Sequence, residues 1–449
     1  MVIPSSARQN SGVNFNSRAF TILLLLILIL AYVANFPFDS GEDVNNARAN
    51  FQSSNRNDFW GGFAPYFYSL VSDRIMDSNL LYAFLYLLLI GIGSFCAHRF
   101  LLRNERIYTP FRASLLLFST LITSLFALQF SRDGTLLAFV WGSLGLLLWG
   151  YFKQKRILWI LISAVLFVIG MSFRPWLGLV SIPLTFFMLA RLHDIQQLTF
   201  RRILFVISGS VALLLAPIMV DQAATKFLNM APSFPQQQVM IMDLSALTCL
   251  SANSSTVEES VKVLKLISNA KKLGAAEICE SFYPQSWASV VFYQKSNSSL
   301  QSPIRMINPS ENMLYETFSQ GWIRLILNHP KDYVQTKIML SSQLLFAGDS
   351  RGTETRFFNS TLMKPLNILR DLRLFSVLPF SLFLFLFTRL RRDSKSQIET
   401  LSIVVFYLVG TISVAVAFIG DNQRYLIPIC LITTFLLINQ RHEKISAHE

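Results

Sequence analysis

Residues 110–152 read PFRASLLLFSTLITSLFALQF-SRDG-TLLAFVWGSLGLLLWGYF, two long apolar runs joined by a short turn that contains an arginine and an aspartate. Each run is close to the length of about 20 residues that an α-helix needs to cross a bilayer. The turn is too short to hold a domain, so the two runs should form a helical hairpin. Charged side chains at the ends of apolar helices are costly unless they are paired or used. The stretch therefore predicts a membrane fold and a place to look for function.

The same alternation of apolar runs and polar connections continues along the 449-residue chain, which is 52% apolar and only 14% charged. The runs occupy residues 19–38, 79–97, 110–130, 135–152, 157–172, 176–190, 203–220, 372–388, 400–419 and 425–439. We therefore expect an all-α polytopic membrane protein with about ten transmembrane helices. Residues 1–220 would form a membrane module of about seven spans, and residues 372–449 one of about three.

Lysine and arginine gather in every second connection along the chain. They are Arg8, Arg18, Arg99, Arg103, Arg106, Lys153, Lys155, Arg156, Arg191, Arg201, Arg202, Arg389, Arg391, Arg392, Lys395, Arg441 and Lys444. Cytoplasmic loops carry such an excess, so we expect both termini in the cytoplasm and the large loop outside a bacterial inner membrane. The net charge of +13 lies mostly in these loops and gives no reason to expect a nucleic-acid partner. A cleaved signal peptide is the alternative for the first run, which is long and lacks a small-x-small cleavage site.

Three kinds of segment then share the outer face. The first is an acidic loop at residues 39–78. The second is a set of tight turns at residues 131–134, 173–175 and 420–424, each of which carries an arginine. The third is the segment 221–371, which is long enough for a small α-rich extracytoplasmic domain.

Two helices are predicted within segment 221–371. Thr256-Val257-Glu258-Glu259 has the pattern of a capping box and predicts a helix that ends near Gly274. A second helix is predicted over residues 311–328, because Asn328-His329-Pro330 disfavours its continuation. We interpret His329 as part of this helix stop, with a catalytic base as the alternative.

Residues 332–347 are amphipathic but too short and too polar for a confident span. A full crossing here would also reverse the orientation of everything that follows and place Arg389–Arg392 outside. We therefore expect an interfacial or re-entrant helix.

Two of the four cysteines, Cys249 and Cys279, fall in the outer segment, whereas Cys96 and Cys430 fall in spans. In an oxidising compartment the first two can form a disulfide worth about 3–4 kcal/mol. The alternative, two buried free thiols, stays open at this point.

Asp39 and Asp43 follow the first span directly and are four residues apart, so on a helical turn both carboxylates would face one side. A carboxylate at the membrane–water boundary suits a base that takes a proton from a substrate hydroxyl. It equally suits a ligand for a hard divalent cation. The alternative is a solvated acidic loop with no chemical role.

The tight turns carry Arg132, Arg174 and Arg424, with Asp133 and Asp421 beside them. Guanidinium groups bind phosphate in a bidentate manner, so three arginines on one face predict a cradle for a lipid-linked phosphate. Each turn also has a purely structural alternative. An Arg132–Asp133 pair could cap the fourth span, and Arg174 could snorkel to lipid phosphate.

This layout resembles the GT-C superfamily of integral-membrane glycosyltransferases, which take sugars from polyprenyl-phosphate carriers. The matching stretches are Phe36-Pro37-Phe38-Asp39-Ser40-Gly41-Glu42-Asp43, Ser131-Arg132-Asp133-Gly134, Trp322-Ile323-Arg324 through His329-Pro330 to Tyr333, and Asp421 through Arg424-Tyr425 to Pro428. They resemble, in order, the acidic first outer loop, the Ser/Thr-Lys/Arg-Asp turn, the helix from the soluble domain to the membrane, and the Arg-Tyr-x-x-Pro entry to a late span.

The resemblance implies inverting transfer of a sugar from a polyprenyl-phosphate donor to a glycan, lipid or protein acceptor. Asp39 or Asp43 would be catalytic, the three turn arginines would bind the donor's phosphate, and Mg²⁺ or Mn²⁺ would be optional. The chain departs from bacterial relatives in the first loop, where Asp58-Phe59-Trp60-Gly61-Gly62-Phe63-Ala64-Pro65 stands in place of Asp-x-His-Pro.

Two other functions remain open from the sequence. A multi-span O-antigen or capsule polymerase or ligase would also use outer arginines, but the acidic loop directly after the first span favours the GT-C reading. A transporter or flippase of polyprenyl-linked glycans would require charges near the centres of spans, whereas these lie mostly at span ends.

Overall fold

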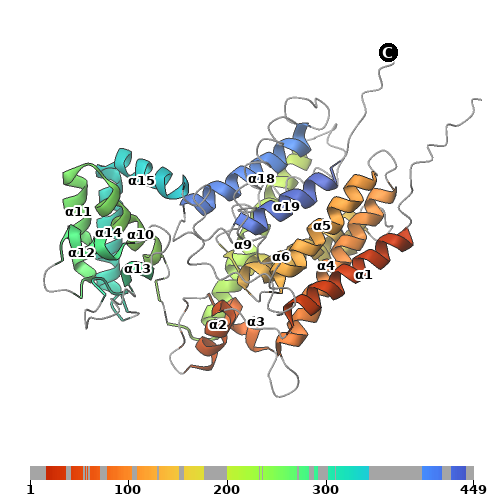
Figure 1. The fold of residues 1–449 in the computed structure, drawn as a ribbon, viewed down its shortest axis with the longest axis horizontal. Helices are drawn as coiled ribbons and strands as arrows, with labels where there is room; N and C mark the ends of the chain where they lie inside the picture. The colour runs from red at the N-terminus through yellow and green to blue at the C-terminus, as the bar shows by residue number, and fades with distance from the viewer. Residues whose placement is uncertain are drawn as a thin grey trace, which may run out of the picture.

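The computed structural model describes residues 17–36, 42–53, 56, 58, 61–70, 78–103, 109–128, 131–150, 156–175, 200–231, 233–234, 236–269, 273–282, 288–291, 302–308, 310–342, 397–416 and 426–440. Regular structure in these residues is helical, and no β-strand forms among them. The helices make two bodies, a bundle of long apolar helices and a smaller group of short helices (Figure 1).

The bundle contains helices at the positions where apolar runs predict spans. They are α1 (Ser17–Asn35), α4 (Ser78–Arg103), α5 (Pro110–Ala127), α6 (Arg132–Gly150), α7 (Arg156–Ser172), α9 (Phe200–Phe227), α18 (Gln397–Val416) and α19 (Leu426–Ile438). The spans expected at 176–190 and 372–388 lie outside the described residues. Among the described residues, α1, α4, α5 and α6 are long and apolar enough to cross a membrane. The chain is a helical membrane protein.

Small residues let α4 and α6 pack closely at the centre of the bundle. A Cβ atom on Gly145 would lie 2.3 Å from the Cα of Gly93, so neither helix tolerates a larger side chain at this crossing. The buried Trp141 ring donates its Nε1–H to Ser94, which in turn hydrogen-bonds Thr120 on α5. Close backbone approach and buried hydroxyl bonds are the usual means of helix association in lipid.

The two ends of the bundle differ in character. At one end, the side chain of Tyr86, near the start of α4, bonds Thr135, near the start of α6. We call this the site end. At the other end, the Arg103 guanidinium lies 5.7 Å from the ring of Trp149, and Arg112 donates to the carbonyl oxygens of Ile438 and Gln440. We call this the basic end.

The second body is a small helical domain with its own core. It consists of α10 (Gln237–Leu250), α11 (Ser254–Leu264), the short 3₁₀ helix Lys265–Ile267, α12 (Ala275–Ser281), α13 (Ala288–Val291), α14 (Asn312–Asn328) and α15 (Pro330–Ser342). Leu244, Leu264 and Phe318 are buried at its centre. Helix α10 also joins the two bodies, because its Met242 and Ala246 pack into the core of the bundle.

The capping-box prediction for α11 is wrong in detail. The helix begins at Ser254, and Asn253 is the cap, accepting the backbone N–H of Ser255. Thr256 is buried and donates its hydroxyl to Asp332, so it does not cap the helix. The helix ends at Leu264, whereas Gly274 precedes α12.

The second predicted helix is found as α14, which ends at Asn328 with His329 as its C-terminal cap, as expected. The His329 ring lies 3.4 Å from the Glu259 carboxylate and 3.9 Å from that of Asp332. Pro330 then begins α15, because proline has no N–H to lose in the first turn of a helix. The expected amphipathic segment 332–347 is thus a short helix as far as Ser342.

Cys249 and Cys279 form a disulfide that ties α10 to α12. The sequence left this open against two free thiols. We expect the Cys249→Ser/Cys279→Ser variant to lose about 3 kcal/mol of stability in the small domain, because an unfolded chain without the crosslink has more freedom. Thermal unfolding with and without reductant measures the loss. Reductant should lower the midpoint of the wild type to that of the variant and leave the variant unchanged. An unaffected wild type would contradict the prediction.

A buried carboxylate holds α10, α14 and α15 together. The Asp243 carboxylate forms a salt bridge with the Lys337 ammonium at 2.6 Å. It also accepts hydrogen bonds from the Trp322 indole N–H and the Tyr333 hydroxyl, at 3.3 and 3.2 Å. Burial raises the pKa of Asp243, and the Lys337 ammonium acts in the opposite direction. The folded carboxyl therefore holds its proton to higher pH than the unfolded one, and its ionisation as the pH rises costs stability.

Replacing Lys337 with methionine should raise the pKa of Asp243 further, because the main opposing charge is removed. We expect a loss of about 2 kcal/mol at neutral pH that shrinks as the pH falls toward the unfolded Asp value of about 4. Unfolding midpoints of the full chain across this pH range test it. Lys262→Met, which removes an exposed lysine of the same domain, is the control and should show neither change.

Candidate functional site

The turn at residues 131–134 forms the start of α6. The Ser131 hydroxyl accepts the N–H of Gly134 at 3.0 Å, and its carbonyl accepts the N–H of Thr135, so Ser131 is the helix cap. Asp133 follows in the first turn, where the helix dipole favours a negative charge. The structure thus assigns the capping role to the serine of the turn.

A buried ion pair links this turn to the end of α7. Arg174 donates from Nε and Nη2 to the two carboxylate oxygens of Asp133, at 2.8 and 2.9 Å. Only 5% of Arg174 and 1% of Asp133 are exposed. The snorkelling alternative for Arg174 is therefore wrong, because its guanidinium is buried and held in a bidentate pair. Arg132 and Asp133 are adjacent on one helix, and adjacent helical residues do not face each other.

The first loop returns to the same end of the bundle through α3 (Phe63–Ser69). Asp221, near the end of α9, accepts the backbone N–H groups of Gly62 and Phe63 at 2.9 and 3.0 Å. Gly61 adopts a φ of +74°, and a Cβ atom on Gly62 would lie 2.1 Å from the Thr225 nitrogen. The Gly61-Gly62 turn is therefore required for α3 to approach α9 this closely.

A second aspartate fastens the loop to the chain beyond α9. Asp58 accepts the backbone N–H and the hydroxyl of Ser233 at 2.6 and 2.7 Å. The backbone pairs as well, since Asp58 donates to Ala231 and Ala231 donates to Arg56. These bonds hold part of the acidic first loop against the segment that leads into the small domain. Helix α3 contacts α9, and α2 (Glu42–Gln52) packs against α3 (Figure 1).

Arg132 lies where these segments meet. Its guanidinium interacts electrostatically with the Asp221 carboxylate, and its side chain is partly exposed. The Arg174 side chain, in contrast to that of Arg132, is buried. We refer to Arg132, Asp133, Arg174 and Asp221 as the turn cluster. Arg132, at the start of α6, thus combines a nearby carboxylate on α9 with a side chain that solvent reaches in part.

Aromatic rings and hydroxyls surround the buried side of the cluster. The hydroxyls of Tyr68 and Tyr86 both lie 2.7 Å from the Thr135 hydroxyl. The ring of Phe173 packs edge-on against the rings of Phe63 and Phe67 at centroid distances of 5.2 and 5.0 Å. The Asp133–Arg174 pair is itself almost fully buried, and an ion pair shielded from water is electrostatically stronger than one in water.

The other expected site residues lie outside the described part of the chain. This holds for Asp39, Asp421 and Arg424. The backbone of Asp43 lies in the first turn of α2, but its side chain is not among those described. Their roles remain predictions.

Sequence reasoning missed Asp221 and did not single out Asp58 from the other first-loop acids. The signal for Asp221 was a carboxylate directly after the apolar run 203–220, in the same kind of position as the turn aspartates. The signal for Asp58 was its place before Gly61-Gly62, a pair that permits a sharp turn. Neither signal indicates a partner, because both partners are far away in the sequence.

Metal binding remains a prediction for the first loop. Within the described residues, no group of three His, Cys, Asp or Glu side chains has an arrangement that could hold a metal ion. The side chains of Asp39 and Asp43, the expected ligands, fall outside those residues.

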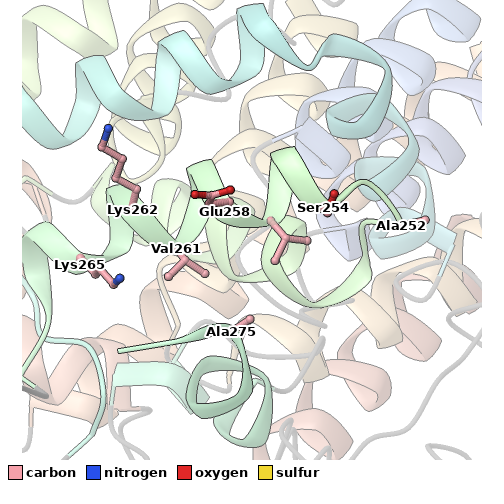
Figure 2. Close-up of a pocket in the computed structure, with 8 residues that line it drawn as sticks. Ala252, Ser254, Glu258, Val261, Lys262, Lys265 and Ala275 are labelled. Carbon is pink, nitrogen blue, oxygen red and sulfur yellow. The ribbon is translucent and has the colours of Figure 1, made fainter. Parts of the chain in front are cut away.

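The small domain carries a surface groove of about 740 Å³ along α11. Figure 2 shows Ser254, Glu258 and Lys262 along this helix, with Ala275 at the start of α12 on the other side of the groove. Val257 and Val261 form part of its lining. The groove contains none of the expected site residues and belongs to a different body from the turn cluster, so we place the candidate site at the cluster.

No protein-family model, curated protein or solved structure matches this chain.

Proposed function

We propose that this chain is a membrane glycosyltransferase that takes a sugar from a polyprenyl-phosphate-linked donor and passes it to a glycan, lipid or protein acceptor. The observation that carries the proposal is the convergence of four segments, distant in the sequence, on the turn cluster that contains Arg132. These are the 131–134 turn, the end of α7, the first-loop helix α3 and the end of α9. A guanidinium at the end of an apolar bundle suits a phosphate whose lipid tail lies in the membrane.

We place the site end outside the cytoplasm, on the periplasmic face if the host membrane is a bacterial inner membrane. The basic end carries Arg18, Arg103, Arg112 and Arg156, together with the first and last described helix ends. A cytoplasmic basic end follows the positive-inside rule and agrees with cytoplasmic termini. A disulfide in the small domain, which adjoins the site end, also fits an oxidising compartment.

In the proposed mechanism, a first-loop carboxylate, Asp43 or Asp39, takes the proton from the acceptor hydroxyl. The hydroxyl oxygen then bonds to the anomeric carbon of the donor sugar, and the bond from that carbon to the phosphate oxygen breaks. Arg132 stabilises the negative charge that develops on the departing polyprenyl phosphate. Arg424, beside Asp421, would be a further phosphate ligand.

Arg174 and Asp133 have a positioning role in this proposal. Their buried bidentate pair holds the start of α6 against the end of α7. Asp221 interacts electrostatically with Arg132 and also holds α3 in place. In this proposal Arg132 contacts the phosphate. Asp133, Arg174 and Asp221 position this arginine without contacting the phosphate themselves.

The position of the buried charges bears on the flippase alternative. Within the described spans, the Asp133–Arg174 pair lies at helix ends, where a reaction at the membrane surface would take place. A central transport pathway would instead require charges in the middle of the bundle. This arrangement favours interfacial chemistry.

Membranes that contain the chain should transfer radiolabelled sugar from a synthetic polyprenyl-phosphate donor to endogenous acceptors. Asp43→Asn or Asp39→Asn should abolish the transfer, since one of these carboxylates removes the proton. Movement of the glycolipid across vesicles with no covalent product would establish the flippase. Transfer of preassembled oligosaccharide from polyprenyl pyrophosphate alone would establish the polymerase or ligase. Full activity in both variants would show that neither carboxylate is the catalytic base.

A further inference from the structure

Helix α15 presents an apolar face to the outside of the small domain. Val334 and Ile338, one turn apart on this face, are 54% and 63% exposed. Leu327, in the last turn of α14, is 73% exposed. The exposed charged residue of α15 is Lys331, whereas Asp332 is turned inward and accepts bonds from Thr256 and Asn253. We call Leu327, Lys331, Val334 and Ile338 the α15 face.

The opposite side of α15 is firmly attached. Lys337 and Tyr333 reach the buried Asp243 carboxylate on α10. Thr336 and Leu340 are also buried. Because these contacts determine the rotation of the helix about its axis, the apolar residues of the α15 face cannot turn inward without breaking the Asp243–Lys337 pair.

The far end of α15 meets the membrane bundle. Leu340 is buried in the core that the bundle helices share, and α15 contacts α18. In Figure 1, α15 runs across the direction of α18 at the end of that helix and does not continue it. Helix α18 itself exposes Leu401 and Ile412, as a lipid-facing helix does. Helix α15 therefore meets, at this end, a helix that exposes apolar side chains.

We infer that α15 lies on the membrane surface at the site end, with Leu327, Val334 and Ile338 in the lipid interface. Lys331 and the exposed Arg324 of α14 would meet lipid phosphate groups, as basic residues of interfacial helices do. The occupant of the face is lipid, because α15 contacts α18, which exposes apolar residues as a lipid-facing helix does. The basic Lys331 and Arg324 also match anionic headgroups. This contact determines the height of the small domain above the membrane, and it does not depend on the glycosyltransferase proposal.

A lipid-depth measurement on the full chain tests this inference. The chain is reconstituted in vesicles of phosphatidylethanolamine and phosphatidylglycerol and labelled with an environment-sensitive fluorophore at Ile338→Cys or Val334→Cys. Leu266→Cys is the matched control, because Leu266 is also an exposed apolar residue of the small domain, 41% exposed, but lies on the 3₁₀ helix after α11. The native Cys96 and Cys430 are buried, and the unsubstituted chain gives the background.

At positions 334 and 338, emission should shift to the blue and be quenched severalfold more by spin-labelled lipid than at position 266. Aqueous iodide should quench in the reverse order. Equal behaviour at all three positions would overturn the inference. A blue shift without lipid quenching that disappears on dilution of the protein in lipid would also overturn it, in favour of a second copy of the chain on the α15 face. Unfolding midpoints of the labelled variants establish that each is folded.

Discussion

Replacing Arg174 with methionine is expected to lower the free energy of unfolding by about 3–5 kcal/mol, because it leaves the buried Asp133 carboxylate without its bidentate partner. The pair is worth less than this figure suggests. Most of the lost free energy of unfolding is the cost of keeping the Asp133 charge buried without a partner. That cost is absent when both charges are removed. Titration of the purified protein with a denaturing detergent in mixed micelles measures the change.

The double variant Arg174→Met/Asp133→Leu separates these contributions. It should recover most of the lost stability, because two apolar side chains of similar volume pack where the ion pair was. Arg103→Met, which removes a more exposed arginine at the basic end, serves as the control and should change stability little. A single Arg174→Met variant as stable as the wild type would mean that Asp133 has another sufficient counter-charge.

Replacing Arg132 with alanine is expected to lower the rate of sugar transfer by about 10²–10³-fold, the usual cost of losing one donor to a developing negative charge. Stability should change little, because the Arg132 side chain is partly exposed. Arg132→Lys should restore part of the rate, since an ammonium supplies charge but not the bidentate geometry. Initial rates with saturating acceptor, at several donor concentrations, separate the loss in kcat from a change in KM.

Arg103→Ala is the matched control for this experiment too, because it removes an arginine from the opposite end of the bundle. It should retain full transfer activity. The proposed role of Arg132 fails if Arg132→Ala and Arg103→Ala transfer sugar equally well while both remain folded. A purely structural role would instead lower the unfolding midpoint and the rate of Arg132→Ala together.

Helix positions in the bundle were predictable because membrane insertion depends on local sequence. A run of about 20 apolar residues forms a membrane-spanning helix wherever it occurs in a chain. The described helices of the bundle coincide with such runs. Helix ends were less predictable. The run 203–220 continues as α9 to Phe227, because polar residues in the last turns are tolerated where they bond to the first loop, as Asp221 does.

In the small domain, the α14 stop at His329 was predictable from one proline, whereas the start of α11 was not. Thr256 and Asn253 are both acceptable caps by residue type. The choice depended on Asp332, which lies 76 residues beyond Thr256 in the sequence and takes its hydroxyl. A local pattern cannot weigh a distant partner of this kind.

The sequence by itself determined that the chain is a helical membrane protein, where its apolar helices lie, and that charged turns stand at their ends. Hydrophobicity and turn chemistry act over a few residues to a few turns, so the order of the chain carries this information. Only the tertiary structure decided that Asp133 pairs with Arg174, 41 residues away, and that Asp221 holds the start of α3 from 159 residues away. Such pairings depend on how each helix is rotated about its axis, and that rotation results from the packing of all the helices together.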